Sequence, residues 1–220
     1  KKYLTIIILL SFAYQIFPQK KDDIANVKID KKYKKSAEQG RKLIAELMTK
    51  ETIPGFSVAV MKDGKLLWSE GFGFADLETR LSVSPKTRFR IGSVSKLLTA
   101  TAVAKLYEQG LLDLDAPIQK YLPNFPKKEF EITSRQLVEH LAGVRHYKRD
   151  EFINRQRYES VSESLKIFQD DALLHQPETK YLYSSRGYVL LSAVIESAAK
   201  QDFPSFMQER VFAPLKMPNT

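Results

Sequence analysis

The sequence contains no cysteine. This absence excludes disulfide frameworks, thiolate zinc sites, thiol nucleophiles and the lipidated cysteine of a lipoprotein. Nine glycines and ten prolines are too few for a collagenous or low-complexity chain. With 43% hydrophobic residues among 220, the chain can instead bury a globular core.

Histidine is scarce, and His140, His146 and His175 show neither His-x-His nor His-Glu-x-x-His spacing. We therefore expect no metal site and interpret each histidine as an ordinary helix-end or surface residue. Gly-x-Ser-x-Gly and Gly-x-x-x-x-Gly-Lys are also absent. Their absence argues against a hydrolase nucleophile elbow and a phosphate-binding loop.

The net charge of +9 is concentrated near the N-terminus. Residues 20–35 contain three Lys-Lys pairs, whereas residues 43–220 are close to neutral. We interpret residues 20–35 as a solvated basic linker, with peripheral contact to anionic lipid as the alternative. Because the rest of the chain has almost no net charge, nucleic-acid binding is not expected.

Residues 1–19 have the pattern of a secretory signal peptide. Two lysines precede an apolar run from Tyr3 to Ala13 that ends in a small-x-small triplet. The run is shorter than the roughly 20 apolar residues that a membrane-spanning helix needs. We expect an exported protein, periplasmic or extracellular, with an uncleaved membrane anchor as the alternative.

The segment from residue 36 to residue 91 predicts a helix followed by a small antiparallel sheet. Residues 36–50 have the apolar periodicity of an amphipathic helix. Residues 56–61 and 65–70 predict two strands joined by an Asp-Gly turn. Residues 71–76 predict a loop, and residues 87–91 a further strand.

The second half of the chain predicts helices. Residues 93–109 are apolar around most of the circumference, which is typical of a largely buried helix. Capping-box patterns begin at Thr133 and Ser160, and two further apolar segments cover residues 187–199 and 203–212. A sheet followed by a separate helical layer indicates an α+β fold.

One nucleophile pattern is present, Ser-x-x-Lys, in which the lysine lies one helical turn after the serine on the same face. It occurs at Ser93–Lys96 and at Ser197–Lys200, about as often as the composition predicts by chance. Lys200 comes at a predicted helix end, where a lysine complements the helix dipole. We therefore expect a structural role for the second pair.

Ser93 differs because it follows the predicted strand 87–91 through Gly92 and begins the predicted buried helix. The positive end of that helix would face whatever the side chain attacks. A buried Lys96 would lose its proton readily, as a general base must, because desolvation disfavours the ammonium form. These local features leave two interpretations open, a catalytic serine and a helix N-cap.

Tyr183 belongs to a second candidate element. Tyr183-Ser184-Ser185 predicts a loop before a helix that starts at about Gly187. From such a loop, Tyr183 could reach a cleft lined by the start of another helix. The alternative is a packed aromatic residue, one of ten tyrosines in the chain.

Taken together, these elements resemble the penicillin-recognising serine hydrolases, which include class C beta-lactamases, D-Ala-D-Ala carboxypeptidases and related esterases. The resemblance covers residues 36–220, which we interpret as one beta-lactamase-related domain. His140–Tyr147 and Tyr183–Ser185 are most similar to the branch of the mitochondrial serine beta-lactamase-like protein and its bacterial relatives. The segments that carry the resemblance are Ile53–Val60, Gly71–Asp76, Phe89–Lys96, Gly110–Pro117, His140–His146, Tyr183–Tyr188 and Pro214–Thr220.

The resemblance implies a beta-lactamase/transpeptidase-like fold and acyl transfer through a serine ester, without metal or organic cofactor. Ser93 would be the nucleophile, Lys96 and Tyr183 its proton-transfer partners, and Ser185 a substrate-binding group. Which of Lys96 and Tyr183 is the base stays open. The implied substrate is a small ester, amide, beta-lactam or D-amino-acid peptide. The alternative is a non-catalytic relative that binds peptidoglycan-like peptides or assembles into filaments.

Two departures from the family pattern qualify this resemblance. Class C enzymes typically have asparagine where this chain has Ser185, which bears on recognition of a beta-lactam side chain. The family's third box, Lys/His-Thr/Ser-Gly on a later strand, is absent, since Lys86-Thr87 is followed by Arg88. We interpret the chain as an N-terminal fragment that lacks the C-terminal strands, inactive and poorly soluble when expressed alone.

Overall fold

The computed structural model describes residues 27–220. The expected signal peptide, residues 1–19, and the first part of the expected basic linker lie outside the described residues. The chain divides into two compact units, with the boundary between Phe89 and Arg90. Within the described part, no helix combines the length and the apolar character that a membrane crossing requires.

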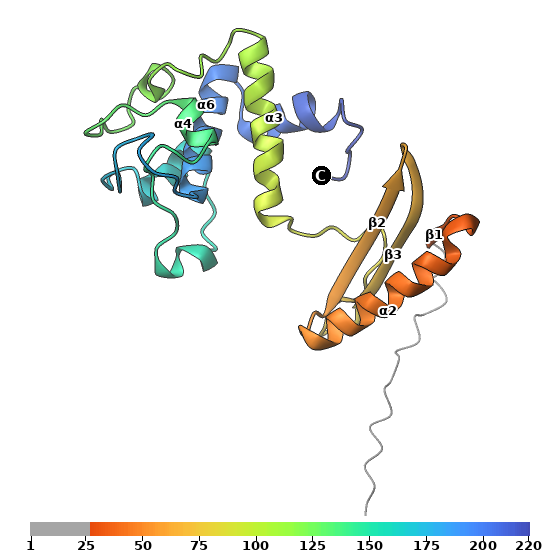
Figure 1. Ribbon diagram of the computed structural model, residues 1–220. Helices are drawn as coiled ribbons and strands as arrows, with labels where there is room; N and C mark the ends of the chain where they lie inside the picture. The colour runs from red at the N-terminus through yellow and green to blue at the C-terminus, as the bar shows by residue number, and fades with distance from the viewer. Residues whose placement is uncertain (1–26) are drawn as a thin grey trace, which may run out of the picture. The chain divides into compact units, whose positions relative to one another are not determined.

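The first unit packs a helix on an antiparallel sheet, in which β1, β3 and β2 are neighbours in that order and β4 pairs with β3. In Figure 1, α2 runs along the hairpin that β2 and β3 form. The elements of this unit are β1 (Lys28–Ile29), a 3₁₀ turn (Lys31–Tyr33), α2 (Lys34–Lys50), β2 (Gly55–Lys62), β3 (Lys65–Asp76) and β4 (Leu81–Ser82).

The predicted hairpin is confirmed. Asp63 and Gly64 both have positive φ angles, 51° and 72°, which is the conformation that a tight two-residue hairpin turn requires. β2 and β3 then pair from Lys62 opposite Lys65 to Gly55 opposite Gly73. The Asp-Gly pair therefore sets the register next to the turn, and an irregularity between Val60 and Met61 shifts it by one residue along the rest of the hairpin.

The predicted loop at residues 71–76 is wrong, because β3 continues through this segment to Asp76. Its glycines allow another backbone to come close rather than ending the strand. A Cβ atom at Gly71 would clash with the carbonyl oxygen of Val83. The Val83 N–H in turn donates to the carbonyl oxygen of Gly73. Glycine in a strand interior often marks such an approach.

The helix predicted at residues 36–50 is confirmed, and α2 begins two residues earlier at Lys34. Ala37 and Ile44 of α2 pack with Trp68 of β3 in a small core, against which Ile29 also packs. The described part of the segment expected to be a linker thus contains β1, a 3₁₀ turn and the start of α2. The reason is that Ile29 covers apolar surface that the sheet would otherwise expose.

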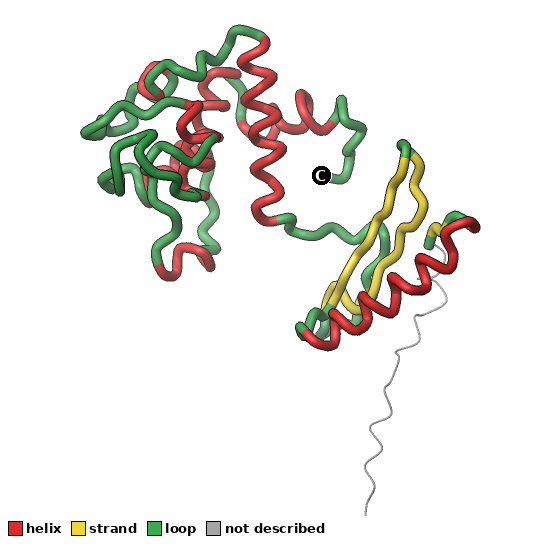
Figure 2. Tube along the Cα trace, viewed as in Figure 1, coloured by secondary structure: helices red, strands yellow, loops and turns green. Residues whose placement is uncertain are grey.

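The second unit is helical and joins its short elements by long loops (Figure 2). The helices expected near residues 134, 161, 187 and 203 are all present. Its elements are 3₁₀ turns at Gly92–Val94, Ile118–Lys120, Arg149–Ile153 and Leu165–Ile167, α3 (Ser95–Glu108), α4 (Ser134–Val138), α5 (Val161–Ser164), α6 (Ser185–Ala199), α7 (Phe203–Phe206) and a π-helical stretch (Met207–Phe212).

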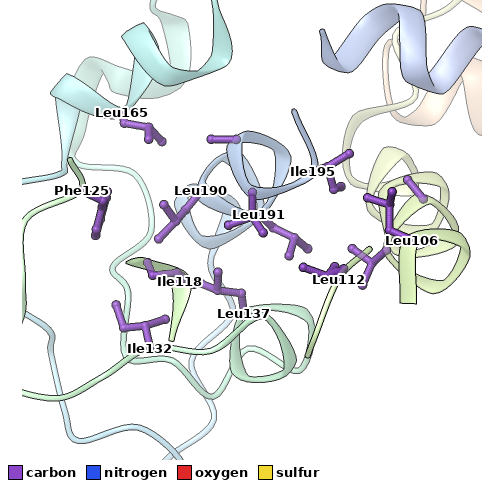
Figure 3. Close-up of a cluster of buried hydrophobic side chains, with 14 of the residues drawn as sticks. Leu106, Leu112, Ile118, Phe125, Ile132, Leu137, Leu165, Leu190, Leu191 and Ile195 are labelled. Atoms are coloured by element: carbon purple, nitrogen blue, oxygen red, sulfur yellow. The ribbon is translucent and has the colours of Figure 1, made fainter. Parts of the chain in front are cut away.

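α6 forms the centre of the second unit's core. Leu190, Leu191 and Ile195 of this helix are fully buried. Figure 3 shows them among side chains from several surrounding segments, including Leu106 of α3 and Leu137 of α4. This packing fixes where the N-terminus of α6 lies relative to α3.

Two predictions around α3 are wrong. Residues 87–91 form no strand, and a 3₁₀ turn rather than a strand leads into the helix. The helix is also not buried all round: Ala102 and Leu106 are buried, whereas Leu97 is exposed. The reason is that only one face of α3 packs on α6 and on the π-helical stretch Met207–Phe212 within this unit.

The loop after α4 depends on a glycine. Gly143 has a φ of 73°, and its carbonyl oxygen accepts a hydrogen bond from the Leu174 N–H at 2.9 Å. A Cβ atom at Gly143 would clash with the carbonyl oxygen of His175. Two loops therefore meet backbone to backbone at a position that only glycine fits.

We predict that Gly143→Ala destabilises the protein more than Gly110→Ala. Both residues have positive φ angles, but a Cβ atom at Gly110 meets no atom within 4 Å. In both variants the free energy of unfolding should fall by roughly 1–2 kcal/mol, because alanine strains a left-handed backbone. In Gly143→Ala the free energy of unfolding should fall by a further ~1–3 kcal/mol, because the added Cβ atom is packed against the His175 carbonyl oxygen. Urea denaturation of the natural full-length protein measures the difference, and equal losses would contradict the close approach.

Candidate active site

Ser93 lies in the 3₁₀ turn Gly92–Val94 that leads into α3, and its residue surface is exposed. Gly92 has a φ of 54°, which lets the chain turn sharply just before the serine. The residue that caps α3 is Val94, not Ser93. The Ser93 hydroxyl instead contacts the side chains of Lys96 and Tyr183.

The structure brings all four predicted site residues together. The Lys96 Nζ donates to the Oγ of Ser93 at 3.3 Å and to the Oγ of Ser185 at 3.0 Å. The Tyr183 hydroxyl donates to the Ser93 Oγ at 2.6 Å. Ser93 and Lys96 come from the start of α3, whereas Tyr183 and Ser185 come from the start of α6.

Lys96 is half-buried rather than buried, which corrects the expectation drawn from the helix pattern. Its Nζ lies 4.8 Å from the centre of the Tyr183 ring and 5.5 Å from that of Tyr188. Aromatic faces attract a cation at these distances. The lysine is therefore held by two hydroxyl groups and two aromatic rings.

The phenol of Tyr183 has a lowered pKa because of the groups around it. Its hydrogen bonds with Lys96 and Ser93 lower the pKa of the phenol below its ordinary value of 10.0. The positive charge of Lys96 acts in the same direction. A phenol of this kind releases and regains a proton more readily than an ordinary tyrosine.

Ser184 and Ser185 fix the start of α6, which begins two residues earlier than predicted. Ser184 caps the helix: its Oγ accepts from the Gly187 N–H at 2.8 Å and donates to the Arg145 carbonyl oxygen at 2.7 Å. Ser185 is buried, and its hydroxyl faces Lys96. In this arrangement Ser185 contacts the lysine directly.

Sequence reasoning missed His140 and His146, which it treated as ordinary helix-end or surface residues. The Ser184 N–H donates to the Nδ1 of His140, and the Ser185 N–H donates to the Nδ1 of His146, both at 3.1 Å. Burial and the nearby charge of Lys96 lower the pKa of both imidazoles. The one available signal was their place at the two ends of the His140–His146 segment.

A buried charge network holds the loop that follows His146. Arg145 and Arg186 are each only 5% exposed, and both donate to the carboxylate of Glu151. Arg145 also bonds Asp171. The hydrogen bond from Arg145, together with that from Arg186, lowers the pKa of Glu151 to about 2. Glu151 therefore stays ionised and pairs with both guanidinium groups at neutral pH.

The second Ser-x-x-Lys pair forms no comparable site. The Ser197 hydroxyl donates to the Tyr121 carbonyl oxygen, and Lys200 is the C-cap of α6. The structural role expected for this pair fits that arrangement. Among residues 27–220, no group of three or more histidine, aspartate or glutamate residues is placed to hold a metal ion.

Comparison with known proteins places this geometry in a family context. The chain is 32% identical over 257 residues to the serine beta-lactamase-like protein LACTB, mitochondrial, of Homo sapiens, covering 86% of this chain and 47% of that protein. It is 28% identical over 189 residues to protein flp of Staphylococcus aureus, covering 84% and 38%. The octameric penicillin-binding protein homologue from Pyrococcus abyssi matches with a TM-score of 0.73 and 28% identity, covering 82% and 43%.

The chain spans about half the length, or less, of these relatives. The helices and the antiparallel sheet described above match the fold of the solved structure, as the resemblance in the sequence predicted. The family model described as beta-lactamase matches residues 41–220, which include the whole Ser93–Lys96–Tyr183 cluster. The chain therefore belongs to the beta-lactamase family, whose members are generally serine hydrolases.

Proposed function

We propose that the protein is a serine hydrolase that forms an acyl-enzyme intermediate at Ser93. The observation that carries the proposal is the direct hydrogen bonding of the Ser93 Oγ to both the amine of Lys96 and the phenol of Tyr183. A nucleophile within hydrogen-bond reach of a base that a further group orients is the common signature of covalent catalysis. The family to which the chain belongs supports the same reaction class.

In the proposed reaction, the Ser93 Oγ attacks the substrate's carbonyl carbon and forms the new ester bond. The hydroxyl proton passes to the Lys96 amine or the Tyr183 phenolate. As the bond to the leaving amine or alcohol breaks, the same pair returns a proton to that group. Water then attacks the ester, and the released acid leaves Ser93 free again.

The proposed substrate is a small ester, an amide, a beta-lactam or a D-amino-acid peptide, with Ser185 as a hydrogen-bonding group beside it. Ser185 also accepts from Lys96, so substrate contact there would act on the lysine as well. The reaction is proposed to need neither a metal nor an organic cofactor. We place it outside the cytoplasm, on the strength of the signal-peptide pattern at residues 1–19.

We predict that Ser93→Ala abolishes covalent labelling, because the substitution removes the attacking oxygen. The natural full-length protein would be treated with a penicillin and with a serine-reactive phosphonate, and its intact mass measured. Ester turnover should fall by at least about 10³-fold in the same variant.

The matched control is Ser197→Ala, which removes the serine of the other Ser-x-x-Lys pair. Its labelling should equal that of the unmodified protein. Labelling that survives Ser93→Ala, or that disappears in Ser197→Ala, contradicts the assignment. No labelling of the natural protein by either probe would favour the alternative, a binding or filament-forming relative.

We predict that Tyr183→Phe lowers the acylation rate by about 10²- to 10⁴-fold, the range typical of a lost acid/base group. The ring and its contacts remain, so the hydroxyl alone is tested. Tyr107→Phe is the control, because Tyr107 lies on α3 and its side chain is largely exposed. Stopped-flow acylation kinetics measure both variants, and equal rates would contradict a role for the Tyr183 hydroxyl.

We also predict that Tyr183 ionises at a lower pH than an ordinary tyrosine. Since its hydrogen bond with Lys96 is the largest cause of the lowered pKa, Lys96→Met should raise that pKa toward 10.0. Ultraviolet difference titration against Tyr183→Phe isolates the signal of this phenol. An identical titration in the presence and absence of Lys96 would show that the two groups do not interact in solution.

A further inference from the structure

Two histidines hold the chain immediately around Tyr183. The N–H groups of the two residues that follow it, Ser184 and Ser185, donate to the Nδ1 atoms of His140 and His146 respectively. On the other side of Tyr183, the Leu182 N–H donates to the carbonyl oxygen of His140 at 2.9 Å. The backbone on both sides of the tyrosine is therefore bonded to the His140–His146 segment.

The histidine rings also contact the tyrosine itself. The His140 ring centre lies 4.6 Å from that of Tyr183 in a tilted arrangement, and the His146 ring meets it edge-on at 5.6 Å. Such contacts restrict where the phenol ring can lie. His140 adopts a φ of 62°, an uncommon conformation for a residue other than glycine. The chain thus accepts backbone strain at the residue whose side chain and carbonyl both bond the Tyr183 segment.

The direction of these hydrogen bonds fixes the protonation state of the rings. A backbone N–H can only donate, so the Nδ1 atom that it meets must carry a lone pair and no proton. Both imidazoles are then neutral, with their hydrogen on Nε2. If a ring gained a second proton, its Nδ1–H would face the N–H of the serine. Two donors cannot bond each other, so the hydrogen bond would be lost.

The charges around the two rings favour this neutral state. Burial, followed by the positive charge of Lys96, lowers the pKa of both histidines, and Arg186 acts in the same direction on His146. The rings therefore protonate only at a more acidic pH than an ordinary histidine, whose pKa is about 6.5. The hydrogen bonds from Ser184 and Ser185 are complete above the lowered pKa of the two imidazoles, and they are lost as the pH falls through that pKa.

We propose that His140 and His146 are positioning residues that hold the Tyr183 hydroxyl against Ser93, and that they do so only while both rings are neutral. This inference rests on the proposed serine hydrolase function. It adds a condition to that function, since the Tyr183–Ser93 hydrogen bond then depends on two rings whose Nδ1 atoms bond the backbone of Ser184 and Ser185. Acylation should accordingly decline on the acidic side as the two imidazoles protonate.

Other groups that face the two rings could contribute to the same pH dependence, so the test has to separate them. The titratable and charged groups that face His140 or His146, or that bond such a group, are Lys96 of α3, Tyr147 and Glu151 of the following loop, Tyr181 and Tyr183 of the segment before α6, and Arg186 and Tyr188 of α6. The two histidines also face each other. None of the other groups is substituted in the variants below.

The experiment compares leucine and asparagine at each histidine in the natural full-length protein. Leucine removes the acceptor, whereas the Oδ1 of asparagine can accept the serine N–H in place of Nδ1 and does not titrate. At His140, leucine also strains the left-handed backbone that asparagine tolerates, so the effect of the acceptor alone is measured at His146. The variants are His140→Leu, His146→Leu, His140→Asn, His146→Asn and the double asparagine variant. His175→Asn is the matched control, because the Nδ1 of His175 lies against the Gln176 carbonyl oxygen and not against the Tyr183 segment.

We expect each leucine variant to acylate about 10²-fold more slowly at about pH 8, the penalty typical of a misplaced reacting group. The asparagine variants should recover most of that rate. The fall of the acylation rate at acidic pH should be weaker in the single asparagine variants. In the double variant it should shift to another pH or disappear. The control should keep both the rate and the decline of the unmodified protein.

The positioning role is overturned if the leucine variants acylate at the unmodified rate, or if the double asparagine variant keeps the full acidic decline. A second readout needs no turnover: release of Tyr183 from Lys96 should return the phenol's pKa toward its ordinary value in the leucine variants. If the natural protein forms no adduct, the proposed function fails, and this titration still decides the inference. An unchanged phenol pKa in both leucine variants would then overturn it.

Discussion

The site depends on the meeting of two helix starts, and above all on the hydrogen bond from Tyr183 to Ser93 across 90 residues of sequence. Helical spacing alone brings Lys96 beside Ser93, since the two are one turn apart. Nothing local brings Tyr183 there. The contact requires the starts of α3 and α6 to meet, and the burial of Leu190, Leu191 and Ile195 against the rest of the core holds α6 where that happens (Figure 3).

The apolar core alone would leave the loop beside α6 free to shift, and the buried charges fix it. Arg145 bonds Glu151 and Asp171, and Arg186 bonds the same Glu151, so the network joins the loop after His146 to the first turn of α6. Burying a charge is costly unless it is paired and hydrogen-bonded. Losing Glu151 would remove the carboxylate that both buried guanidinium groups share, which makes this geometry strongly preferred over nearby alternatives.

Features that depend on residues close together in the sequence could be predicted. The Asp63-Gly64 turn, the helix at residues 36–50 and the Thr133 capping box depend on local conformational preferences, and the structure has all three. Residues 71–76 and 87–91 were misjudged because glycine spacing and β-propensity do not reveal which backbone comes close or which strand is available for pairing. The roles of His140 and His146 depend on amides about 40 residues away, which no local pattern shows.

The neutral histidines also bear on the electrostatics of the proposed nucleophile. Lys96 lies close enough to influence the titration of Tyr183, His140 and His146. Protonation of either imidazole would place a second positive charge beside Lys96, where like charges repel and favour loss of a proton from one of them. Neutral rings add no further positive charge beside Lys96. The hydrogen bonds of Tyr183 with Lys96 and Ser93, and after them the charge of Lys96, lower the pKa of the Tyr183 phenol. The same contacts that position the tyrosine therefore make it readier to exchange a proton with Ser93.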